Sequence, residues 1–117
     1  MATTADPDCL FCKIVAGKLP SDRVYEDDAI VAFKDIHPQA PIHFLVIPKA
    51  HVATLNDFEA EHATLIGKLL LTAKHLAGAH GLAGYRVVMN VNREGGQVVF
   101  HTHLHVLGGR PMKGALG

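Results

Sequence analysis

The sequence lacks an excess of charge of either sign. Among its 117 residues, 11 Lys and Arg balance 11 Asp and Glu, so the formal net charge at pH 7 is zero. Proteins that bind the nucleic-acid backbone or an anionic membrane need a surplus of Lys and Arg, because both surfaces are negatively charged. We therefore predict no nucleic-acid partner and no membrane partner.

Long apolar runs are missing as well. The longest apolar stretches are far shorter than the roughly 18 residues that indicate a membrane span. Residues 1–8 are polar and partly acidic, unlike an Arg-rich transit peptide or a secretory signal with an apolar centre. We therefore expect a cytoplasmic protein. Because 49% of residues are hydrophobic and 19% charged, we also expect one folded domain over residues 1–117.

Glycine motifs that hold phosphates through backbone N–H groups are absent too. Gly95-Gly96 and Gly108-Gly109 are bare pairs that match neither the dinucleotide-binding fingerprint nor the P-loop. Any phosphate chemistry must therefore be done by side chains. The chain instead has nine histidines, and histidine is the side chain that most readily changes charge near neutral pH.

The apolar pattern predicts two helices and about five strands. A short helix covers residues 9–16, and a long helix follows a capping box of Asn56 and Glu59, with apolar residues at helical spacing from 65 to 77. Five β-rich runs cover residues 23–25, 30–33, 43–47, 85–89 and 98–107. These elements predict an α+β fold, a five-stranded antiparallel sheet covered on one face.

Three alternating histidines are the most informative segment. In a strand, His101, His103 and His105 would project from one face, because residues two apart share a face. Their Cα atoms would lie about 6.6 Å apart, so the rings could converge on one phosphate-sized group. The same spacing also chelates metals, and a single histidine is often an ordinary surface residue, so spacing leaves catalysis and metal binding open.

The motif His101-Thr102-His103-Leu104-His105-Val106-Leu107-Gly108-Gly109 resembles the signature of the histidine triad (HIT) nucleotide-binding family. Residues 35–41, 43–49 and 95–97 are similar to its Hint branch of nucleoside phosphoramidases. The resemblance extends roughly from Cys9 to Arg110. It implies a five-stranded antiparallel sheet with two helices, assembled as a homodimer whose sheets pair into a larger one.

The resemblance also implies a mechanism. His103 would attack the α-phosphorus of a purine nucleoside phosphoramidate, forming a nucleotidyl-histidine intermediate and releasing an amine and then a nucleoside monophosphate. His105 and His43 would donate hydrogen bonds to the reacting groups, and His101 would complete the cluster. No cofactor is expected to be required for this chemistry.

The same resemblance implies a nucleotide site. Asp35 would accept hydrogen bonds from the ribose hydroxyls, while Asn90 and Gln97 would lie near the phosphate and the leaving group. An apolar pocket for the base would comprise Leu10, Phe11, Ile14, Phe33 and Ile36. These five residues also suit an ordinary core, and that interpretation stays open.

Two departures from the family pattern concern the leaving group. Val98 stands where Hint proteins commonly have a serine that hydrogen-bonds the scissile region, and valine cannot donate. The segment 111–117 lacks the tryptophan-bearing end of many eukaryotic relatives. Leaving-group preference is therefore open, and hydrolysis of adenylylated amino acids or nucleoside phosphosulfates is an alternative activity. A nucleotide-binding regulatory or interaction module, stabilised by zinc, is the alternative from another class.

Cys9 and Cys12 are the only cysteines, and a disulfide between them would close too short a loop to add much stability. Their spacing is half of a zinc site. The resemblance implies that His51 and His101 complete it as a structural Cys2His2 site. Reduced thiols without metal, or a redox pair, are the alternatives.

Overall fold

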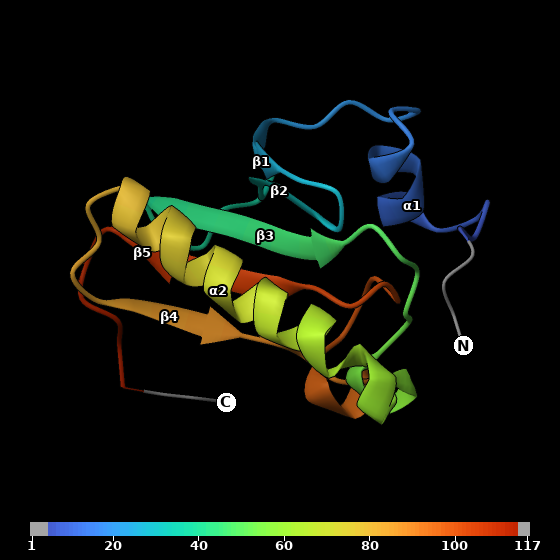
Figure 1. Ribbon diagram of the computed structural model, residues 1–117. Helices are drawn as coiled ribbons and strands as arrows, with labels where there is room; N and C mark the ends of the chain where they lie inside the picture. The colour runs from blue at the N-terminus through green and yellow to red at the C-terminus, as the bar shows by residue number, and fades with distance from the viewer. Residues whose placement is uncertain (1–4, 115–117) are drawn as a thin grey trace.

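The computed structural model describes residues 5–114, which contain one five-stranded sheet (Figure 1). Its strands are β1 (Arg23–Glu26), β2 (Ile30–Lys34), β3 (Ile42–Pro48), β4 (Tyr85–Val88) and β5 (Leu104–Gly108). They lie in the order β1-β2-β3-β5-β4, and each neighbouring pair is antiparallel. The predicted α+β architecture with a five-stranded antiparallel sheet is confirmed.

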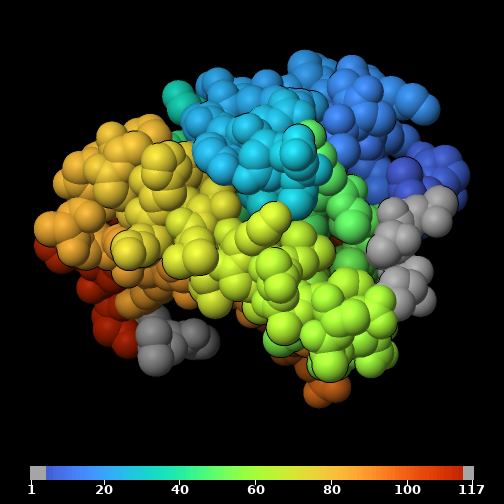
Figure 2. Space-filling view, viewed as in Figure 1, coloured from blue at the N-terminus to red at the C-terminus, as the bar shows by residue number. Residues whose placement is uncertain are grey.

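Two α-helices cover opposite faces of this sheet. Helix α2 (Ala63–Ala79) crosses one face over β3 and β5, as Figure 1 shows, and its atoms run as a yellow-green band beside the β1–β2 hairpin in Figure 2. Helix α1 (Leu10–Val15) packs against the other face. The sequence interpretation expected cover on one face only, so the short helix supplies cover that it did not anticipate.

The alternation of side chains along the strands divides the core into two layers. Under α2 lie Ile30, Ala32, Phe44, Val46, Leu104 and Val106, which contact Leu69, Ala73 and Leu76 of the helix. On the other face lie Val31, Phe33, Leu45 and Ile47, which contact Cys9, Phe11, Cys12 and Ile14. Because β2 and β3 are buried on both faces, their sequences are almost continuously apolar.

The capping box before α2 differs from the expected one. Two short 3-10 turns, η1 (Leu55–Asp57) and η2 (Ala60–His62), occupy the segment that leads into the helix. The reciprocal cap joins Glu59 and His62: the Glu59 side chain accepts from the His62 N–H, and Nδ1 of His62 accepts from the Glu59 N–H at 2.9 Å. The box is therefore displaced three residues along the chain from Asn56, because the 3-10 turns delay the start of the helix.

The last strand is shorter than the sequence indicated. Strand β5 begins at Leu104, so His105 lies in the ladder, whereas His101 and His103 lie on the approach to it. The segment before β5 bonds to the loop after β3 instead of to a neighbouring strand, because both the backbone N–H and the hydroxyl of Thr102 donate to the carbonyl of Val52 at 2.8 Å. The predicted strand through residues 98–103 is thus wrong, although the histidines still reach one face of the sheet.

The described part of the chain also bears on membrane insertion. Between residues 5 and 114, no helix combines the length and the apolar character needed to cross a bilayer.

Candidate functional site

Four histidines gather on the face of the sheet that α1 covers. Nε2 of His43, from β3, lies 2.9 Å from Nδ1 of His105, from β5. The rings of His103 and His105 have centroids 5.1 Å apart, and His103 in turn contacts the edge of Phe11 at 5.2 Å. His43, His101 and His103 are buried, and His105 is partly exposed. The structure therefore brings together the predicted triad histidines and His43.

The proton on His103 is placed by the backbone. Nδ1 of His103 donates to the carbonyl oxygen of His101 at 2.8 Å, because a carbonyl can only accept. Burial lowers the pKa of His103 below its usual value, so the ring is neutral at pH 7. A neutral ring with its proton on Nδ1 has a free lone pair on Nε2, which is the form that can attack phosphorus.

The protons on His43 and His105 follow from one backbone donor. The Gln39 N–H donates to Nδ1 of His43 at 3.0 Å, so the neutral His43 ring carries its proton on Nε2. That Nε2–H can donate to Nδ1 of His105, which leaves the His105 proton on Nε2. Burial lowers the pKa of His43, and burial together with His103 and His43 lowers the pKa of His105 to about 4. His105 is thus a neutral donor through Nε2.

Asp35 stands beside these histidines at the end of β2. Its Oδ2 lies 3.4 Å from Nε2 of His43, and its Oδ1 accepts from the His37 N–H at 2.8 Å. The ligand atoms of Asp35, His43 and His105 lie within 4.8 Å of one another, close enough for a cation. The Gln39 N–H opposes that use, because it leaves a proton rather than a lone pair on the inward nitrogen of His43.

A second cluster joins α1 to the sheet. Sγ of Cys9 lies 3.3 Å from Nδ1 of His101, and Sγ of Cys12 lies 3.2 Å from Nδ1 of His51. All four ligand atoms lie within 4.8 Å of one another. The structure thus assembles the predicted Cys9, Cys12, His51 and His101 from three segments of the chain.

The donor set of this cluster fits zinc. Two sulfurs and two imidazole nitrogens are a common structural zinc set. Nε2 of His101 donates to the carbonyl of Pro48 at 2.7 Å, which leaves Nδ1 free to face the sulfurs, as the outer hydrogen bonds of zinc-bound histidines usually do. Burial lowers the pKa of His101 to about 4 and raises the pKa of Cys9 to about 11. A bound cation would offset the cost of ionising that buried thiol.

The predicted base pocket separates into core and surface residues. Phe11 and Phe33 pack edge to face with centroids 5.5 Å apart, and Ile14 is buried beside them. Leu10 and Ile36 are instead exposed, by 48% and 86%. The buried residues Phe11, Phe33 and Ile14 therefore have the core role that the sequence left open. Leu10 and Ile36 instead offer apolar surface.

Gln97 lies under a loop, with its amide fully bonded. Its Oε1 accepts from the Asn92 N–H at 2.8 Å, and its Nε2 donates to the carbonyls of Ala53 and Val99. Gln97 thus braces the loop that precedes the triad. Asn90 is partly buried against the glycines of this loop, and Val98 is 87% exposed.

Sequence reasoning missed the backbone groups that orient the histidines. The Gln39 N–H and the carbonyls of Pro48 and His101 each hold one imidazole. The prolines at 38 and 41 marked a loop around Gln39, but no residue pattern reports the direction of a backbone N–H.

Comparison with known proteins shows similarity along most of the chain. The HIT domain model matches residues 16–112. The chain is 50% identical over 105 residues to the purine nucleoside phosphoramidase of Escherichia coli (strain K12), covering 88% of each protein.

Solved structures agree with this match. A HIT family hydrolase from Legionella pneumophila Philadelphia 1 is 55% identical with a TM-score of 0.89, over 91% of this chain and 96% of that one. A zinc-bound histidine triad family protein from Mycobacterium smegmatis is 36% identical with a TM-score of 0.80, over 88% of this chain and 76% of that one. The similarity thus includes the sheet, α2 and the histidine-bearing segments.

Proposed function

The chain belongs to the HIT domain family, and on that premise we propose that it is a nucleotide hydrolase acting at phosphorus and, within that class, a purine nucleoside phosphoramidase. The observation that carries the proposal is the neutral His103 ring, whose Nδ1–H is held by the His101 carbonyl. Its Nε2 lone pair is therefore free to act as the nucleophile. The relative named purine nucleoside phosphoramidase, 50% identical to this chain, supports the choice of substrate class.

The first step transfers the nucleotidyl group to His103. The Nε2 lone pair forms a bond to the α-phosphorus, while the phosphorus–nitrogen bond breaks and its electron pair leaves with the amine, which takes up a proton from solvent. The bond from Nδ1 to the His101 carbonyl stabilises the positive charge that develops on the ring. In the second step the oxygen of water forms a bond to phosphorus while the bond from phosphorus to Nε2 breaks. The electron pair returns to Nε2, one proton of the water goes to solvent, and nucleoside monophosphate leaves a neutral ring.

His105 supports both steps as a donor. Its proton lies on Nε2, because Nδ1 faces the proton on His43. A fixed N–H in a partly buried site stabilises the negative charge that collects on the phosphoryl oxygens in the transition state. His43 orients His105, and Asp35, 3.4 Å from His43, stabilises that arrangement through its carboxylate.

The nucleoside would bind at the same end of the sheet. Asp35 has a partly exposed carboxylate and would accept from the ribose hydroxyls, while Leu10 and Ile36 offer apolar surface to the base. Apolar contact of this kind accepts either purine with little hydrogen-bond selectivity. Asn90 would lie near the phosphate, and Gln97 would hold the loop beside it.

Zinc would bind at Cys9, Cys12, His51 and His101. The ion would supply structural cross-linking of α1 to the sheet, with no part in the reaction. His101 would then serve two purposes, because its ring faces the sulfurs while its carbonyl orients His103. The zinc-bound relative from Mycobacterium smegmatis supports this assignment.

The assembly predicted from the sequence is a homodimer with a shared sheet. Strands β1 and β4 form the two edges of the sheet in the described chain, and an edge strand offers unpaired N–H and C=O groups to a second copy. Sedimentation equilibrium would give twice the chain mass if this prediction is right. The single domain and the cytoplasmic location also stay predictions.

The test is hydrolysis of an adenosine phosphoramidate that carries a fluorescent amine. Wild-type protein should release the amine, and acid-quenched mixtures should contain a nucleotidyl adduct on His103. His103→Ala should bind adenosine monophosphate yet release no amine. Nucleotide binding without release by the wild type would contradict the proposal and favour a binding module. Faster cleavage of adenylylated amino acids or of phosphosulfates in competition would reassign the leaving group.

A further inference from the structure

We propose that Arg110 is a positioning residue, which holds Gln39 so that the Gln39 N–H fixes the tautomer of His43 and, through it, that of His105. The inference rests on the proposed function for its kinetic consequence. The chain of contacts itself is independent of any substrate, and it links the segment after β5 to the loop of residues 35–41.

The segment after β5 passes directly against this loop. Gly109 has a φ of 94°, in the left-handed region that glycine adopts without strain. A Cβ at Gly109 would lie 2.9 Å from Cβ of Pro41, which is too close for any larger residue without a shift of the loop. Gly109 therefore turns the chain and allows Arg110 to reach the loop.

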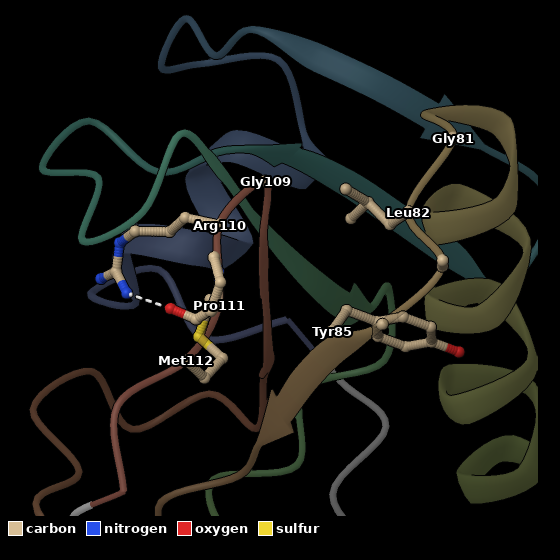
Figure 3. Close-up of a pocket in the computed structure, with 9 residues that line it drawn as sticks. Gly81, Leu82, Tyr85, Gly109, Arg110, Pro111 and Met112 are labelled. Atoms are coloured by element: carbon tan, nitrogen blue, oxygen red, sulfur yellow. Dashed lines mark hydrogen bonds between the residues drawn. The ribbon is translucent and has the colours of Figure 1, made fainter.

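Arg110 then binds the loop through hydrogen bonds of its guanidinium. Its Nη2 donates to the carbonyl oxygen of Gln39 at 3.0 Å, and its Nη1 donates to the carbonyl of Pro111 at 3.0 Å. Figure 3 shows the side chain directed away from Leu82 and Tyr85, with the bond to Pro111 dashed. A planar fork of donors can hold two carbonyls in a fixed relation, which a single ammonium group does less well.

Gln39 is the residue of the loop that acts on the histidines. Its N–H donates to Nδ1 of His43, while its carbonyl is the one that Arg110 holds. The ends of the loop are joined by the bond from the Asp35 N–H to the His43 carbonyl at 3.0 Å. The side-chain amide of Gln39 donates to the carbonyl of His37, on the exposed side of the loop. Arg110 thus holds the carbonyl of the same residue whose N–H meets the His43 ring.

The consequence is chemical, because a histidine has two neutral tautomers. With the Gln39 N–H on Nδ1, His43 must present a proton from Nε2 to His105. If Gln39 turned away, His43 could carry its proton on Nδ1 and accept through Nε2. The proton of His105 would then move to Nδ1, and His105 would lose the Nε2–H donor that the proposed function requires for the phosphoryl group.

The experiment compares Arg110→Ala and Arg110→Lys with wild type. Removing the hydrogen bond to Gln39 should lower kcat about 3- to 10-fold and change KM little. This range is the change in rate that corresponds to the free energy of one hydrogen bond. Arg110→Lys keeps a charged donor but cannot hold both carbonyls at once, so it should recover only part of kcat. The long-range ¹H–¹⁵N spectrum of the imidazoles should show His43 as the Nε2–H tautomer in wild type and as a mixture in Arg110→Ala.

Arg86→Ala is the matched control. Nη2 of Arg86 donates to the carbonyl of Lys113 at 2.7 Å, so this second guanidinium holds the same carboxy-terminal segment without touching the loop. Its variant should keep the wild-type kcat and the wild-type His43 tautomer. Equal losses in both variants would show a merely structural effect and overturn the inference.

The spectrum separates this inference from the proposed function. An unchanged His43 tautomer in Arg110→Ala would overturn the positioning role, whatever the activity. If wild-type protein cleaved no phosphoramidate, the proposed function would fail, but the tautomer comparison would still decide what Arg110 does.

Discussion

The carbonyl oxygen of His101 lies 2.8 Å from Nδ1 of His103, so one backbone group connects the Cys–His cluster to the proposed nucleophile. The His101 ring lies on the other side of this connection, with Nδ1 3.3 Å from Sγ of Cys9 and Nε2 2.7 Å from the carbonyl of Pro48. His101 therefore supplies both a ring to the Cys–His cluster and the backbone acceptor that sets the His103 tautomer.

Zinc removal should destabilise the protein. We expect about one zinc per chain in protein purified without chelator, because the ligand atoms of two cysteines and two histidines converge within 4.8 Å. Cys12→Ser should lose the metal and lower the melting temperature, as measured by elemental analysis and calorimetry. His75→Asn, which changes a histidine outside the cluster, is the control. Metal-free protein with an unchanged melting temperature would remove the proposal.

Acid should destabilise the chelator-treated protein in a defined pH range. The pKa values of His101 and His105 fall from 6.5 to about 4 on folding, chiefly through burial. Below pH 6.5 the unfolded chain binds protons that the folded chain does not, so the free energy of unfolding should decrease as the pH falls towards 4. Urea titrations between pH 7.5 and pH 4.5 would measure this slope.

His105→Asn provides the control for the acid effect. Because asparagine does not titrate, the variant should show a shallower loss of stability over the same pH range. A slope identical to that of the wild type would mean that His105 does not contribute to it.

The layer beneath α2 should be sensitive to cavities. Leu69 is fully buried, so Leu69→Ala should lower the free energy of unfolding by about 2–5 kcal/mol. Leu71, two residues along the same helix, is 64% exposed. Leu71→Ala should therefore change the free energy of unfolding by only about 0.5 kcal/mol. Denaturant unfolding of both variants gives the comparison, and similar losses would contradict the assignment of the buried face.

Nucleotide affinity should depend on Asp35 through the ribose. Asp35→Ala should weaken binding of adenosine monophosphate about 10-fold or more, since a hydrogen bond to a charged acceptor is lost. It should hardly affect the 2′,3′-dideoxy analogue, which has no ribose hydroxyls to donate. Titration calorimetry with both ligands measures the difference. An equal loss of affinity for the two ligands would mean that Asp35 acts through its contact with His43 and not through the ribose.

Val98 offers a test of the leaving-group contact. Its side chain is 87% exposed, so a hydroxyl introduced there would be free to donate. Val98→Ser should raise kcat/KM by a factor that corresponds to one hydrogen bond, about 1 kcal/mol. Val98→Ala removes the methyl groups without adding a donor and serves as the control. A serine variant no faster than the alanine variant would argue against the contact.

Much of the architecture follows from local pattern. The β1–β2 hairpin and the central strand lie where β-rich runs predicted them, and the long helix lies where helical spacing predicted it. Predictions failed at two places. The start of β5 was displaced by the bonds from Thr102 to the distant Val52. The capping box moved to Glu59 and His62, because 3-10 turns precede the helix.

The sequence by itself determined which residues to propose for the chemistry, since three alternating histidines and a Cys-x-x-Cys pair are local patterns. Only the tertiary structure decided how each of them is placed and oriented. It brings His51 and His101 to the cysteines, and it divides the apolar residues into the buried Phe11 and the exposed Ile36. The tautomers of His43 and His103 depend on backbone groups of Gln39 and His101, whose directions are set by the folded chain. A proton's position on an imidazole is fixed by the partner of the opposite nitrogen, and no residue pattern contains that partner.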